Sequence, residues 1–142
     1  MSIVIDASVA LKWVIDEEDS GAARALLAGE VLSAPDLLFV ECANVLWAKA
    51  RRRQIARADA RAALAAIEAT PIRAFPARAH ATAALAMASE LDQTAYDCLY
   101  LAVAIAERAT LVTGDDAFIH AVAAHPVYKS SIAPLAGRSS QR

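Results

Sequence analysis

The sequence lacks the features that would place it outside a cell or in a membrane. Its two cysteines, Cys42 and Cys98, form no CxxC pair, so neither a zinc-site spacing nor a disulfide framework is present. The first residues, MSIVIDAS, contain no basic segment and carry Asp6 within their apolar run, unlike a signal peptide. The longest apolar stretch, LYLAVAIA at 99–106, is too short to span a bilayer. We therefore expect a cytoplasmic protein without a membrane partner.

An excess of positive charge is also missing. The formal net charge of −2 argues against a cationic field over the whole protein, of the kind that attracts nucleic acid. Nucleic acid is not excluded, because a bound metal would supply positive charge at one site. A chain of 142 residues, 58% of them hydrophobic, is long enough for a single domain with its own core. We expect this domain to span residues 1–136, followed by a flexible tail at 137–142.

Short apolar runs alternate with longer segments of helical periodicity. The pattern predicts strands at 2–5, 31–33, 72–75, 110–113 and 127–128. It predicts helices at 8–15, 20–28, 36–52, 58–68, 77–90, 94–109 and 116–124. Ser8 is the expected N-cap of the first helix, and Val40 and Trp47 are expected on the apolar side of the third. Alternating strands and helices indicate an α/β fold with a central parallel sheet.

Acidic residues stand where these elements meet. Asp6 follows the first strand, Glu41 and Asp97 lie in the first turns of two helices, and Asp115 and Asp116 follow the strand TLVT. Strand ends and the starts of the following helices share one edge of a parallel sheet. The acids at 6, 41, 97 and 115 are therefore expected to converge there.

Each acid also has an ordinary structural interpretation, and singly that interpretation is the better one. Asp6 and Asp115 would serve as helix caps or turn residues, and Thr94 to Asp97 fits a capping box. Glu41 is harder to explain, because it has no Lys or Arg three or four residues away. Four carboxylates in one cleft would repel one another, and a divalent cation would remove that penalty. Oxygen ligands favour Mg²⁺ or Mn²⁺, which commonly serve phosphodiester hydrolysis.

Three segments resemble the PIN-domain ribonucleases, and most closely the toxins of VapBC-type toxin–antitoxin pairs. They are IVIDAS at 3–8, APDLLFVECANVLW at 34–47, and YDCLYLAVA at 96–104 followed by LVTGDD at 111–116. The motifs span almost the whole chain in the family's order. The resemblance implies a three-layer α/β/α fold, endonucleolytic RNA cleavage by metal-activated water with Mg²⁺ or Mn²⁺, a homodimer, and a small antitoxin partner.

The resemblance also assigns roles to particular residues. It implies an acidic quartet made of Asp6, Glu41, Asp97 and Asp115, with Asp6 and Asp97 as the direct metal ligands. The supporting residues that it implies are Ser8, Asn44, Thr113 and Asp116. Ser8 and Thr113 would hold carboxylates or waters by hydrogen bonds, and Asn44 would lie near the cleft. Asp115 would support the metal site, while Asp116 would cap the last helix or hold a water.

Two questions stay open at this stage. The basic run Arg51–Arg53, with Lys49 and Arg57, is either a solvated helix end or a face for RNA or an antitoxin. The acidic pocket would also suit a receiver-like phosphoacceptor domain, although Glu41 would then have no role. A degenerate PIN fold that serves as a scaffold is the other alternative to a ribonuclease.

Overall fold

Five parallel strands form the centre of the molecule. The computed structural model describes residues 2–135. The strands are β1 (Ser2–Ile5), β2 (Val31–Pro35), β3 (Ile72–Phe75), β4 (Thr110–Thr113) and β5 (Ile132–Pro134). Their order across the sheet is β3-β2-β1-β4-β5, and every neighbouring pair is parallel. The predicted α/β fold with a parallel sheet is confirmed.

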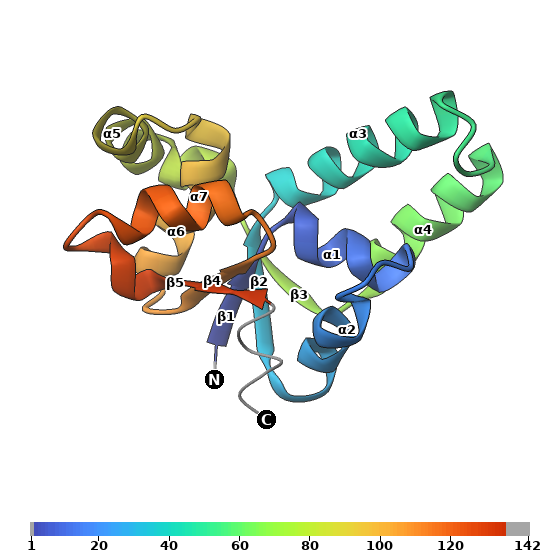
Figure 1. Cartoon of the computed structure of the whole chain (residues 1–142), viewed down its shortest axis with the longest axis horizontal. Helices are drawn as coiled ribbons and strands as arrows, with labels where there is room; N and C mark the ends of the chain where they lie inside the picture. Colours follow the sequence, from blue (N-terminus) through green and yellow to red (C-terminus); the bar gives the residue numbers. More distant parts are fainter. Residues whose placement is uncertain (1, 136–142) are drawn as a thin grey trace.

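Helices cover both faces of this sheet. They are α1 (Ala7–Val14), α2 (Ser20–Gly29), α3 (Leu37–Arg51), α4 (Arg57–Ala69), α5 (Ala81–Leu91), α6 (Ala95–Ala106) and α7 (Asp116–Ala123), with short 3-10 turns η1 (Ala77–His80) and η2 (Tyr128–Ser131). Figure 1 shows α1 to α4 on one side of the sheet and α5 to α7 on the other. The three-layer arrangement is therefore also confirmed. Within the described residues, no helix is long and apolar enough to cross a membrane.

Two predictions about the elements need correction, and one stays untested. The strand predicted at 127–128 is wrong, because the chain there enters η2 and the last strand follows at Ile132–Pro134. A three-residue strand at the edge of a sheet carries too little pattern to be recognised. The helix predicted at 77–90 is divided into η1 and α5. The predicted tail at 137–142 and the predicted domain end at 136 lie outside the described residues.

The central strand and one helix are buried on all sides. Ile3, Val4 and Ile5 of β1 are fully buried, as expected for the middle strand of a covered sheet. Every residue of α6 from 98 to 104 is buried as well. This helix contacts β1, β2 and β4, and α5 packs against it. The fold therefore rests on an apolar layer that fixes where β1, β4 and α6 end.

Helix α3 turns a different side to the core than the spacing of its apolar residues predicts. Leu38, Cys42 and Leu46 are buried, whereas Val40 and Trp47 are 67% and 57% exposed. The helix is apolar around most of its circumference, so periodicity alone does not identify the buried side. The indole ring of Trp47 therefore lies on the exposed side of α3, where it does not contribute to the core.

The strand order places a topological switch point at one edge of the sheet. From β1 the chain builds outward through β2 and β3 on one side, and then through β4 and β5 on the other. In such sheets the connections that leave the two central strands diverge, and ligands bind outside their carboxyl ends. The switch point here lies between β1 and β4. Asp6 and Asp115 follow those two strands directly.

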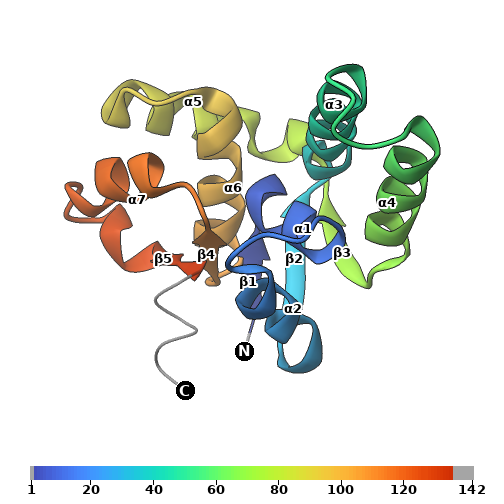
Figure 2. The ribbon, with the colours of Figure 1, turned by 45° about the vertical axis from the view of Figure 1, so that its right-hand side comes forward.

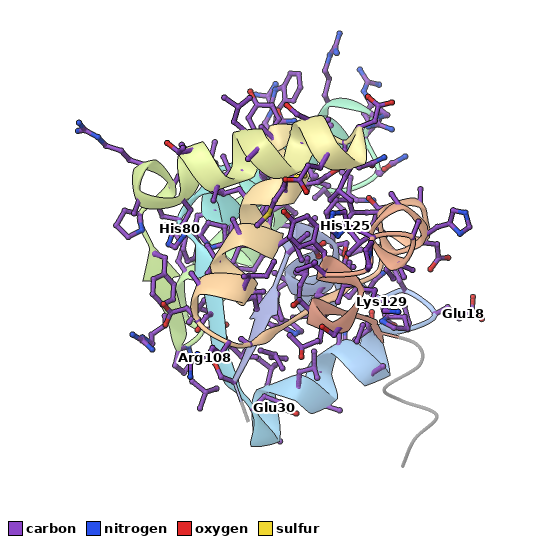
Figure 3. All side chains as sticks on the ribbon, turned by 90° about the vertical axis from the view of Figure 1, so that its left-hand side faces the viewer. Glu18, Glu30, His80, Arg108, His125 and Lys129 are labelled. Atoms are coloured by element: carbon purple, nitrogen blue, oxygen red, sulfur yellow. The ribbon has the colours of Figure 1, made fainter. Side chains whose placement is uncertain are left out.

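Two helices end with an arginine in the left-handed conformation. After α3, Arg53 has φ 60°, Gln54 N donates to Lys49 O at 2.9 Å, and Arg53 N donates to Ala50 O at 3.0 Å. This is the Schellman pattern, which normally places glycine at the left-handed position. After α6, Arg108 repeats the conformation with φ 53°. Arg108, labelled in Figure 3, precedes β4 and so lies at the opposite end of that strand from Asp115.

Candidate functional site

The first carboxylate of the site is held at the junction of β1 and α1. Asp6 is the N-cap of α1, and its Oδ1 accepts hydrogen bonds from Val9 N at 3.3 Å and from Ser8 Oγ at 2.5 Å. Its Oδ2 accepts a hydrogen bond from the hydroxyl of Thr113 on the neighbouring strand. The prediction that Ser8 caps this helix is wrong. The carboxylate of Asp6 takes that position, and Ser8 instead donates to it from the first turn.

Hydroxyl groups tie the end of β4 to the same junction. Thr113 is fully buried, and its Oγ1 accepts from Asp115 N at 3.1 Å and lies 3.4 Å from Ser8 Oγ. Gly114 N donates to Ser8 Oγ at 2.9 Å. The loop lies so close to α1 that a Cβ at Gly114 would come within 3.4 Å of Ser8 Oγ. Ser8 and Thr113 thus orient Asp6, the geometry that the resemblance implied for them.

The two adjacent aspartates occupy different positions at the start of α7. Asp115 is the N-cap of α7, with Oδ1 accepting from Phe118 N at 3.1 Å, and Asp116 is already the first helical residue. The prediction that Asp116 caps this helix is therefore wrong. A two-residue run of aspartates does not reveal which of them has the extended backbone of a cap. Capping engages one oxygen of Asp115, and among the described residues no hydrogen bond engages the other.

Glu41 has a partner that the sequence reasoning missed. Its Oε1 accepts a hydrogen bond from the hydroxyl of Tyr100, a buried residue of α6. Glu41 comes from α3, so this bond joins helices from opposite sides of the sheet (Figure 1). A signal was present, because Tyr100 follows Asp97 by three residues and therefore shares its side of the helix. The sequence around Glu41 does not reveal this partner, because Tyr100 lies 59 residues away on another helix.

The remaining predicted residues lie nearby but make fewer contacts. Asp97 stands in the first turn of α6, where Thr94 Oγ1 accepts from its backbone N at 3.2 Å, as the capping pattern predicted. Asn44 is exposed on α3, one turn after Glu41. In the part of the chain that the structure describes, the Asn44 side chain makes no hydrogen bond. Its predicted place near the cleft rests on its position along α3.

The electrostatics show which acids interact. Burial raises the pKa of Asp6, hydrogen bonds from Ser8, Thr113 and Val9 oppose that shift, and the charge of Asp97 adds to it. Burial also raises the pKa of Glu41 against the Tyr100 hydrogen bond, with further increases from Asp97 and Asp6. The pKa of Asp97 is raised by burial and then by the charge of Asp115, while a hydrogen bond with Thr94 opposes the shift. Three of the four acids therefore interact mutually, and Asp115 joins them through Asp97.

Within the part of the chain that the structure describes, no basic side chain forms an ion pair with these acids. Lys12, on α1, is paired with Glu17 at 2.9 Å and with Asp19 at 3.0 Å. Among residues 2–135, no lysine or arginine forms an ion pair with any of the four acids. The acids consequently repel one another when they are ionised. A cation among them would lower that repulsion.

The donor atoms fit a hard cation with an incomplete protein shell. The acids offer carboxylate oxygens alone, the ligands that Mg²⁺ and Mn²⁺ prefer. Over the described range, no three acidic, histidine or cysteine side chains are grouped closely enough to hold an ion together. The four acids thus lie within electrostatic reach without forming a closed cage. Mg²⁺ tolerates this, because it commonly keeps several waters and binds through one or two carboxylates.

Comparisons with known proteins place the chain in a family. The family model described as PIN domain matches residues 3–124. VapC ribonuclease Mb0985 of Mycobacterium bovis and ribonuclease VapC9 of Mycobacterium tuberculosis are each 34% identical over 113 residues, covering 80% of this chain and 85% of the relative. The chain therefore belongs to the PIN-domain family, and it is related there to the VapC ribonucleases. The receiver-like alternative is wrong.

Solved structures share the fold. PAE2754 from Pyrobaculum aerophilum matches with a TM-score of 0.67 at 20% identity, over 99% of this chain and 94% of its own. VapBC2 from Rickettsia felis, bound to a DNA fragment from its promoter, matches at 0.64 and 15% identity, over 94% and 98%. VapC20 of Mycobacterium tuberculosis, a toxin that cleaves the sarcin–ricin loop, matches at 0.60 and 20% identity, over 84% and 94%.

Removing one acid should change how stability depends on pH. A carboxyl group whose pKa rises on folding holds its proton more tightly in the folded state, so stability falls as pH rises from about 4 through the folded pKa. Asp97→Asn removes one such group and one neighbour of Asp6 and Glu41. In EDTA, we expect this variant to gain stability relative to wild type between pH 4 and pH 7, measured by urea denaturation.

A matched control variant separates the effect of repulsion among the acids from the effect of removing an aspartate from the first turn of a helix. Asp59 occupies the same position in the first turn of α4, and it is exposed and outside the acid cluster. Asp59→Asn should therefore run closely parallel to wild type over the same pH range. If Asp97→Asn does the same, the acids do not repel one another in the folded protein.

Proposed function

We propose that this chain is a metal-dependent endoribonuclease, the toxin of a toxin–antitoxin pair. The observation that carries the proposal is the hydrogen-bonded placement of Asp6 and Glu41 beside Asp97 at the switch point of the sheet, where the charge of Asp97 raises the pKa of both other acids. The relationship to VapC ribonucleases supports RNA as the substrate. A fold neighbour that cleaves the sarcin–ricin loop adds support for RNA at the level of the fold alone. A degenerate PIN scaffold would not require uncompensated acids to remain together.

We assign Mg²⁺, with Mn²⁺ as a substitute, to Asp6 and Asp97. Asp6 is already oriented by Ser8 and Thr113, and Asp97 is the acid whose charge affects both Asp6 and Glu41. Asp115 would complete the acidic surroundings through the oxygen that does not cap α7. When bound, the cation supplies positive charge to the phosphate group and makes an attacking water more acidic.

Glu41 is proposed to direct the attacking water. Tyr100 holds Oε1, which leaves Oε2 to accept a proton from the water as its oxygen forms a bond to phosphorus. The bond from phosphorus to the 3′ oxygen breaks in line, and that oxygen takes a proton from solvent water. The raised pKa of Glu41 brings it closer to neutral pH, where a general base is most effective. Tyr100 acts as a positioning residue.

The proposed setting follows from the family relationship. A nuclease with an open acidic site needs restraint inside its own cell, and we propose a small antitoxin as the partner. Its Arg or Lys would enter the acid cluster and substitute for the cation. A fold neighbour solved as VapBC2 is consistent with such a pair. We further propose a homodimer that acts in the cytoplasm.

Metal binding should stabilise the protein through the two proposed ligands. Mg²⁺ at one hundred times its dissociation constant contributes about 2.7 kcal/mol, or roughly 5 to 10 °C in Tm for a chain of this size. We expect that rise for wild type and for Asp59→Asn, and its loss in Asp6→Asn and Asp97→Asn. Differential scanning fluorimetry across a Mg²⁺ titration measures it. An undiminished rise in both site variants would contradict the ligand assignment.

Cleavage should leave ends that report the mechanism. Attack by water yields a 5′-phosphate and a 3′-hydroxyl, whereas attack by the ribose 2′-hydroxyl yields a 2′,3′-cyclic phosphate. We expect the former ends by mass spectrometry, no reaction in EDTA, and a loss of about 10²- to 10⁴-fold in rate for Glu41→Gln. Tyr100→Phe removes a hydrogen bond that lowers the pKa of Glu41, so the acidic limb of its pH–rate profile should move to higher pH. Cyclic phosphate ends would contradict the mechanism.

A further inference from the structure

A groove lined by arginines lies between α3 and α4. These helices form a hairpin that stands away from the sheet (Figure 2). The groove has a volume of about 790 Å³, and Arg51, Arg53, Arg57, Arg61 and Trp47 line it together with alanines and leucines. None of the described residues that line it is acidic. The sequence indicated part of this basic surface, but Arg61 is brought to it by the fold of α4.

No ion pair within the described residues balances the charge of this arginine groove. Arg24 pairs with Asp16 at 3.3 Å, and Arg73 lies 3.9 Å from Glu107. Across residues 2–135, none of the four groove arginines forms an ion pair. Four unpaired guanidinium groups in a chain of net charge −2 repel one another. Their planar donor groups match phosphate oxygens.

An exposed indole ring completes the groove. Trp47 is 57% exposed, and the guanidinium of Arg51 lies 5.6 Å from its ring centre. Trp13, by contrast, packs against the core and donates Nε1 to Ala23 O at 2.9 Å. The exposed ring offers a surface on which a base can stack, and stacking on aromatic side chains accepts any base.

Helix α3 connects this groove to the acid cluster. Glu41, Asn44 and Trp47 are spaced by three residues, so they form an oblique row in which each step turns about 60° around the helix axis. At 1.5 Å per residue, Trp47 lies about 9 Å and Arg51 about 15 Å along the axis from Glu41. These two distances correspond to about three and about four stacked nucleotides, at roughly 3.4 Å each. The exposed Asn44 lies between them.

We propose that the arginine groove binds the RNA strand beside the cleavage point, with phosphates on its arginines and one base stacked on Trp47. This proposal rests on the proposed nuclease function. The alternative occupant is an acidic amphipathic helix of a partner protein. The contacts favour RNA, because Leu46 is only 2% exposed, Leu64 is partly buried and the alanines are small, so that Trp47 is the most exposed large apolar side chain of the groove.

Binding is measured without cleavage. A fluorescein-labelled single-stranded 12-nucleotide RNA is titrated in EDTA, and its anisotropy is followed at several salt concentrations. We expect Trp47→Ala to weaken binding at least about fivefold and Trp47→Phe to restore most of it, since stacking is worth roughly 1–3 kcal/mol per base. The double variant Arg57→Gln/Arg61→Gln should lower the slope of log K against log salt by about 1.4, because each lost phosphate contact contributes about 0.7.

The two left-handed arginines provide a matched pair. Arg53→Gly and Arg108→Gly both relieve the same backbone conformation, so both should keep or slightly raise Tm. Only Arg53 lines the groove, and Arg108 precedes β4, at the opposite end of that strand from Asp115. We therefore expect the salt slope to fall by about 0.7 for Arg53→Gly and to stay unchanged for Arg108→Gly.

The outcomes separate this proposal from the proposed function. With Mg²⁺, Trp47→Ala should raise KM and leave kcat nearly unchanged, as expected for a residue away from the reacting atoms. If wild type cleaves RNA and the groove variants bind it normally, the groove proposal is wrong and the function stands. If the groove variants lose RNA but wild type never cleaves it, the groove is an RNA site on a non-enzymatic domain. Variants that lose an acidic helical peptide while keeping RNA would show a protein-docking groove instead.

Discussion

The hydrogen bonds that Ser8 and Thr113 donate to Asp6 are the constraint on which the site depends. They join the ends of β1 and β4, the two strands between which the sheet changes direction. Without them, a buried carboxylate beside other carboxylates would turn toward solvent or take up a proton. With them, Asp6 stays fixed, and its neighbours Glu41 and Asp97 share the cost of repulsion. We therefore attribute the proposed metal binding to the repulsion among these carboxylates, which a cation would lower, and not to a preformed set of metal ligands.

Helix α3 takes part in the core, in the acid cluster and in the arginine groove. One side of it, with Leu38, Cys42 and Leu46, packs into the core. A second side directs Glu41 toward Tyr100 of α6, across the edge of the sheet. The third side is exposed and carries Trp47 toward the arginines of α4. A single helix therefore determines how far the arginine groove lies from the acids, and the fold offers no freedom to change that distance.

Much of this arrangement could be predicted from the sequence. The parts that could not be predicted were hidden for physical reasons. The alternation of apolar runs and helices predicted the parallel sheet, and strand ends predicted where the acids stand. The sequence did not distinguish Asp115 from Asp116 as the cap, because that choice depends on backbone angles. It did not reveal Tyr100, whose bond to Glu41 depends on tertiary packing. It misplaced the core side of α3 because nearly all of that helix is apolar. The four acids as a working site remain a proposal.

Anomalous scattering from crystals grown with Mn²⁺ tests the central claim most directly. We expect a difference peak between the carboxylates of Asp6 and Asp97, with waters completing the coordination of the ion and Asp115 near it. In crystals of Asp97→Asn, grown under the same conditions, that peak should be absent. A peak elsewhere, or no peak at saturating Mn²⁺ in wild type, would contradict the claim that these acids are held together in order to bind a divalent cation.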